Sequence, residues 1–116
     1  MPNAEITAED LIAGSASTYD VEIPPEVARP GGGGTGSGLK VRMRPLSIGT
    51  FQLIMRASRQ DPGLIPLLMI KESLTEPVMS LEQVKQMHLG LVTFLIAHIR
   101  EISGLTEKKT SQRNGQ

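Results

Sequence analysis

A run of eight residues, GGGGTGSG at Gly31–Gly38, interrupts the chain and limits what can fold on either side of it. Glycine loses more backbone entropy on ordering than any other residue and has no side chain to bury, so the run predicts a linker. It does not match a phosphate-binding loop, because it lacks the lysine-serine ending and precedes a predicted strand instead of following one. The run divides the 116 residues into a short first part and a longer part that must hold the core.

Residues 1–38 are predicted to form a disordered, flexible acidic arm that ends in this linker. Six carboxylates stand against one arginine, and the scattered apolar residues are too few to offset the entropy of ordering. Two pieces are expected to order on contact: Ala8–Ala13 as a helical turn, and Tyr19–Ile23 as a strand in which Tyr19, Val21 and Ile23 share a face. This candidate arm strand suits addition to the edge of a partner's sheet, and a solvated tail is the other interpretation.

Residues 39–105 are predicted to form a mainly α domain: about three helices, preceded by one short β-strand and the disordered N-terminal arm. LKVRMRPL at Leu39–Leu46 alternates apolar and basic residues, which is typical of a half-buried strand. Ser47 is a good N-cap for a helix over Ile48–Arg59. The apolar stripe of this first helix consists of Ile48, Phe51, Ile54 and Met55.

Two more helices are expected further along the chain. The second runs from about Pro66 to Leu74 and is apolar on nearly every side, which favours a central position. SLEQ at Ser80–Gln83 is a capping box and predicts the start of the third helix. The apolar stripe of this helix continues to Gly104, a glycine suited to a left-handed C-cap, so a helix of about six turns is expected. The polar tail 106–116 is predicted to fray.

Side chains that commonly catalyse reactions or bind metals are scarce in this sequence. The chain has no cysteine, and with His88 and His98 as its two histidines, no metal site, cofactor or enzymatic activity is expected. Glu72 and Glu76 could share a helix face, but an acidic surface patch is the simpler interpretation. No signal peptide stands at the N-terminus and no stretch reaches the roughly 18 apolar residues of a membrane span, so a cytoplasmic location and no membrane partner are expected.

Two sets of residues are candidate binding surfaces. Lys40, Arg42 and Arg44 form a basic face that could contact phosphates, but the chain has three aromatic residues, too few for a stacking platform, so a solvated face is favoured and nucleic acid is not an expected partner. Methionines fill irregular cores and also form adaptable grooves, and both interpretations stay open. The candidate partner-binding residues are flexible or apolar side chains of the helices: Met55, Leu64, Leu68, Met69, Met87 and Phe94.

Four short motifs occur in order along the domain: VRMRPLS at Val41–Ser47, SLTEP at Ser73–Pro77, MSLEQV at Met79–Val84 and IREISGL at Ile99–Leu105. With these motifs, residues 39–105 resemble the small tail assembly chaperones of long-tailed phages and the similar proteins encoded with phage-derived contractile injection systems. The long glycine-rich arm departs from the family's pattern.

The resemblance implies a function without catalysis. It implies a mainly helical protein that binds the tape-measure protein and helps to recruit tube subunits during assembly. The alternatives are a permanent structural component of the tail tube or baseplate, and a nucleic-acid-binding regulator that uses the basic face. Self-association is a further expectation, because the core of so small a domain rarely supplies more than roughly 3–5 kcal/mol by itself.

Overall fold

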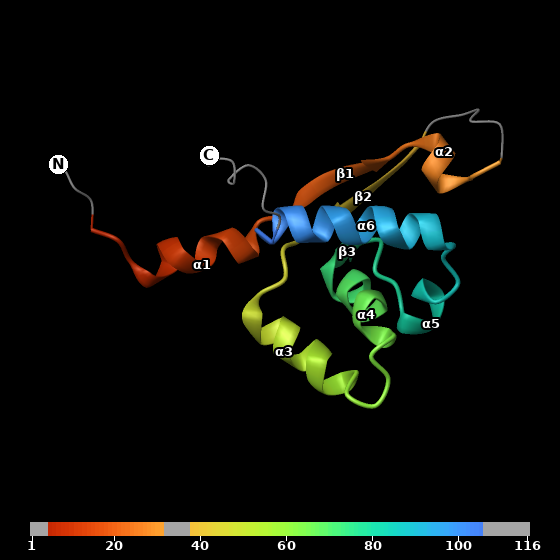
Figure 1. Cartoon of the computed structure of the whole chain (residues 1–116). Helices are drawn as coiled ribbons and strands as arrows, with labels where there is room; N and C mark the ends of the chain where they lie inside the picture. Colours follow the sequence, from red (N-terminus) through yellow and green to blue (C-terminus); the bar gives the residue numbers. More distant parts are fainter. Residues whose placement is uncertain (1–4, 32–37, 106–116) are drawn as a thin grey trace, which may run out of the picture.

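The computed structural model describes residues 5–31 and 38–105. The predicted linker, apart from its two end residues, and the predicted tail 106–116 lie outside the described residues. Helices and strands follow one another in the order α1 (Ala8–Ala16), β1 (Tyr19–Ile23), α2 (Pro25–Ala28), β2 (Leu39–Met43), α3 (Ile48–Ala57), α4 (Leu64–Ser73), β3 (Leu74–Glu76), α5 (Leu81–Val84) and α6 (Leu89–Ile102) (Figure 1).

The three strands form one antiparallel sheet in the order β1-β2-β3. β1 pairs with β2 along its whole length, with Tyr19 opposite Met43 and Ile23 opposite Leu39. Because directly paired residues point to the same face, the apolar residues of both strands gather on one side of the sheet. Met43 is completely buried there, and Val21 and Ile23 are buried beside it.

The expected fold class is wrong. The described residues contain six helices and a three-stranded sheet, an α/β mix with 54% helix and 14% strand, where three helices, one strand and a disordered arm were predicted. The main reason is that Tyr19–Ile23 pairs within its own chain, and this pairing gives the apolar residues of the first part a core to join. The boundary placed after residue 38 falls between two paired strands.

Capping residues set the helix boundaries much as the sequence predicts. The Ser47 side chain accepts a hydrogen bond from the backbone of Thr50 at the start of α3. Ser80 and Gln83 form the expected capping box at α5. Gly104 follows α6 with a φ of 79°, the left-handed conformation that glycine adopts without strain. These three predicted signals are confirmed.

The predicted third helix is two helices. α5 ends at Val84, and α6 begins at Leu89 on the other side of a short turn. His88 is the N-cap of α6: its Nδ1 accepts a hydrogen bond from the backbone N–H of Leu91 at 3.2 Å. The imidazole therefore performs the role that Ser, Thr, Asp or Asn usually performs at this position.

Helix α4 occupies the centre of the helical layer, as its apolar composition predicts. It packs against α3, α5, α6 and β3, and Met69 and Ile70 are buried. Its last residue, Ser73, joins it to the end of β2: Ser73 Oγ donates to the Arg44 carbonyl at 2.6 Å, and the Arg44 N–H donates to the Ser73 carbonyl at 2.9 Å. Sheet and helices share one core, made of Val21, Ile23, Met43, Ile54, Met69, Ile70, Leu74, Val84, Leu95 and Ile99.

Helix α1 stands apart from this core. It projects from the end of the sheet at β1, and none of its residues is buried (Figure 1). Thr7 and Asp10 form a capping box that fixes its start. Within the described parts of the chain, no helix is both long enough and apolar enough to cross a membrane.

A candidate protein-binding surface on helix α3

Helix α3 carries more apolar side chains than its packing uses. It contacts the body mainly through α4, and Ile54 is the one buried residue of the helix. Ile48, Leu53 and Met55 are 73%, 59% and 43% exposed. At 100° per residue, Ile48 and Met55 lie on one flank of the Ile54 face and Leu53 lies on the other. We call Ile48, Phe51, Leu53 and Met55 the α3 surface.

One flank of α3 borders an apolar groove, which we call the Ile48 groove. Its lining consists of Leu46, Ser47, Ile48, Phe51, Ser103 and Leu105, and its volume is about 340 Å³. The groove forms where the start of α3 meets the end of α6, and the N–H of Leu46 donates to Ser103 Oγ at 3.0 Å across it. A second hollow shares Ile48 and Phe51 and extends along α3 to Met55, Arg56 and Arg59.

The other flank of α3 borders a smaller hollow between α3 and α4. It has a volume of about 160 Å³ and is lined by Thr50, Leu53, Ile54, Ala57, Leu68 and Glu72. Leu53 is the most exposed large apolar residue of this lining. Apolar surface is therefore open to solvent on both sides of one helix.

The structure separates the six predicted partner-binding residues. Met55 alone is exposed, on the α3 surface. Leu64 is half-buried, and so are Leu68, Met87 and Phe94, which pack against the core. Met69 is 7% exposed and belongs to the core itself, so it presents little side-chain surface to a partner.

Sequence reasoning missed the most exposed members of the surface. The sequence places Ile48 on the apolar stripe of its helix and does not single out Leu53. Leu53 lies off that stripe, and an apolar residue outside the packing face of an amphipathic helix was the signal that could have identified it. Leu105, at the end of the Ile48 groove, was assigned to no surface.

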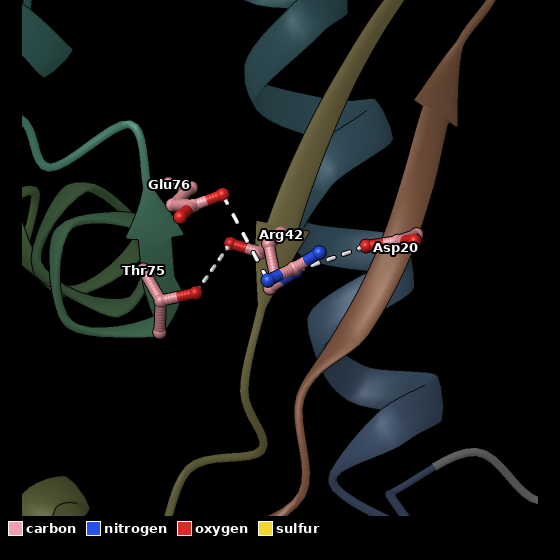
Figure 2. Close-up of polar contacts among 4 residues, drawn as sticks. All are labelled: Asp20, Arg42, Thr75 and Glu76. Carbon is pink, nitrogen blue, oxygen red and sulfur yellow. Dashed lines mark hydrogen bonds and ion pairs between the residues drawn. The ribbon is translucent and has the colours of Figure 1, made fainter.

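The candidate basic face is largely engaged within the chain. Arg42 Nε donates to Asp20 Oδ1 at 3.0 Å, and its Nη1 lies 3.9 Å from a carboxylate oxygen of Glu76 (Figure 2). The hydrogen bond with Asp20, and then the charges of Asp20 and Glu76, raise the pKa of the Arg42 guanidinium. Lys40 lies opposite Glu22 in the register of the sheet. The outer face therefore alternates acids and bases, which gives phosphates little net attraction.

The remaining candidates for chemistry have structural roles. His88 caps α6, and the ring of His98 packs on Phe94 with 4.7 Å between the ring centroids. Glu72 pairs with Lys71 at 3.5 Å, and Glu76 pairs with Arg42. In residues 5–31 and 38–105, no group of three or more histidine, aspartate or glutamate side chains is placed to hold a metal ion.

Comparisons of the chain with protein-family models, with curated proteins and with solved structures find no match. A functional proposal therefore rests on the α3 surface and on the four sequence motifs.

Proposed function

We propose that this protein is a non-enzymatic, cytoplasmic tail assembly chaperone of a phage tail or contractile injection system, which binds the tape-measure protein and helps to recruit tube subunits. The proposal is supported by the resemblance of the sequence motifs in residues 39–105 to this family, and by the α3 surface, where a partner could bind. The observation that carries the proposal is the exposure of Ile48 and Leu53 on opposite flanks of one helix.

The α3 surface has the properties of a helix-binding site. Burial of a leucine or isoleucine side chain contributes about 1.5–3 kcal/mol, so even a few of these residues give a partner a useful affinity. An amphipathic helix laid into an apolar groove is a common mode of peptide recognition. The resemblance implies a long, helical tape-measure protein, and segments of such a protein offer apolar faces of this kind.

The test is co-expression of the full chain with the tape-measure and tube proteins of the same locus, followed by affinity purification. We expect the chain to recover the tape-measure protein. Leu53→Glu places a carboxylate on the flank that borders Glu72, and we expect it to weaken recovery at least about tenfold because an apolar contact is replaced by a charge. Leu89→Glu is the matched control, since Leu89 is 83% exposed at the opposite end of the helical layer, at the start of α6.

Recovery of neither protein by the wild-type chain would contradict the proposal. Equal recovery by Leu53→Glu and by the wild-type chain would remove α3 from the interface. Circular dichroism of each variant verifies that the fold is retained.

The alternative of a permanent structural component has lost part of its support. It drew on an arm that orders against a neighbour through Tyr19–Ile23, and β1 is already paired with β2 in the chain itself. Its remaining support is the position of β1 at an edge of the sheet. Mass spectrometry of purified particles separates the two roles, because a structural component is present in stoichiometric amount and a chaperone that leaves is absent.

A further inference from the structure

Helix α1 carries exposed apolar side chains, and none of its residues is buried in the described chain. Leu11 and Ile12 are 79% and 61% exposed, and Ile6, next to the N-cap, is 74% exposed. Leu11 and Ile12 follow Ala8 by three and four positions, so the three side chains lie on one side of the helix. An isolated helix of nine residues is marginal in water, and α1 therefore has much to gain from docking on another surface.

The Ile48 groove complements α1 in chemistry. Its lining is mainly apolar, and the hollow that continues from it is bordered by Arg56 and Arg59. The first turn of α1 carries Glu9 and Asp10. Among the described residues, neither Glu9 nor the two arginines form an ion pair. An apolar helix with an acidic end thus matches an apolar groove with a basic end, and such complementarity orients one surface on the other.

The connection between α1 and the sheet directs α1 away from its own chain. Ser17 and Thr18 alone separate α1 from β1, and Ser17 is extended at φ −76° and ψ 150°. β1 is fixed in turn by its register with β2. α1 consequently leaves the sheet at its end and points outward (Figure 1). In this position its apolar side is accessible to a second molecule.

We propose that α1 of one copy docks in the Ile48 groove of a second copy, and that reciprocal exchange gives a symmetric dimer. Under twofold symmetry each copy gives its helix and receives the helix of its partner, so the contact occurs twice and the assembly closes. Leu53, on the opposite flank of α3, stays open to another protein. The inference goes beyond the proposed function and does not depend on it.

Sedimentation equilibrium of the full chain, purified alone, tests the proposal. We expect a concentration-dependent dimer. A helix variant, Leu11→Gln with Ile12→Gln, should raise the dimer Kd more than about a hundredfold, because both copies of the contact are lost. A groove variant, which combines Ile48→Gln in the groove with Met55→Gln in the adjoining hollow, should have the same effect. All four side chains are exposed, so we expect both variants to fold, and circular dichroism checks this. The matched control, Leu89→Gln, should leave the Kd unchanged.

An equimolar mixture of the helix variant and the groove variant distinguishes exchange from other modes of pairing. The groove variant keeps an intact α1 and the helix variant keeps an intact groove. The mixture should therefore form a heterodimer with a lower Kd than the homodimer of either variant. A wild-type chain that stays monomeric at all concentrations overturns the proposal, including a monomer in which α1 closes on its own groove. A groove variant that dimerises as well as the wild type also overturns it, because α1 would then pair elsewhere.

Discussion

Among single residues, Ser73 has the most consequential position in the fold. Its side chain is fully buried, and its hydroxyl and carbonyl both bond to the backbone of Arg44. Ser73 therefore holds the end of α4 against the end of β2. The sequence shows a serine in an SLTEP motif and nothing of this contact, because the two residues are 29 positions apart.

We expect Ser73→Ala to lower the free energy of unfolding by about 1 to 2 kcal/mol, because the Arg44 carbonyl loses the hydrogen bond from the fully buried Ser73 side chain. Alanine is the better helix former, so helix propensity does not explain such a loss. Urea denaturation measures the difference, provided that the m-value, the slope of the unfolding free energy against urea concentration, is the same in both proteins. Thr75→Val is the control: Thr75 Oγ1 donates to the Arg42 carbonyl at 3.1 Å on the exposed side of the sheet (Figure 2), where water replaces it, and a change below about 0.5 kcal/mol is expected. Equal losses would contradict this explanation.

At the scale of helices and strands, two capping boxes of the same kind lie in different surroundings. Thr7 with Asp10 and Ser80 with Gln83 are both complete capping boxes. The first starts α1, which has no buried residue, and the second starts α5, whose Val84 is completely buried. The same local interaction is thus coupled to the core in one helix and independent of it in the other.

We therefore expect Ser80→Ala to lower the free energy of unfolding of the whole chain by about 1 kcal/mol, as the loss of an N-cap usually does. Thr7→Ala should leave that value unchanged in a dilute, monomeric sample and should reduce only the helicity of α1. Thermal unfolding measures the first effect, and amide hydrogen exchange within α1 measures the second. A fall in global stability on Thr7→Ala at high dilution would show that α1 is packed on the body.

The elements show which signals in a sequence are reliable. Local signals served well: the caps at Ser47 and Ser80 and the turn at Gly104 depend on neighbouring residues only. The break between Val84 and Leu89 escaped prediction because the four residues between them include neither glycine nor proline and the apolar stripe continues past them. β3 escaped because three residues after a helix are too few to show an alternating pattern. The exposed α3 residues were missed for a related reason, since periodicity identifies an apolar face but not the neighbour that covers it.

For the whole molecule, long-range pairing decided the architecture. The distribution of charge along the chain is consistent with this pairing. The acidic first part and the basic second part meet in the sheet, where Asp20 pairs with Arg42 and Glu22 lies opposite Lys40. From composition alone, this asymmetry indicates only two soluble segments. The pairing of acids with bases depends on the register of the strands, which composition does not contain. The acids of α1, Glu9 and Asp10, belong to the part of this charge that lies outside the sheet, and Arg56 and Arg59 are candidates to pair with them.

Charge reversal tests whether α1 and α3 meet in this way. We expect Glu9→Lys and Arg59→Glu each to raise the dimer Kd roughly tenfold, because like charges then face each other at both contacts, and the combination of the two to restore most of the affinity. Added salt should reduce these differences by screening. Glu26→Lys, the same change in the first turn of α2 at the other end of the sheet, should have no effect (Figure 1). Sedimentation equilibrium gives the constants, and a double variant weaker than both single variants would show that Glu9 and Arg59 do not face each other.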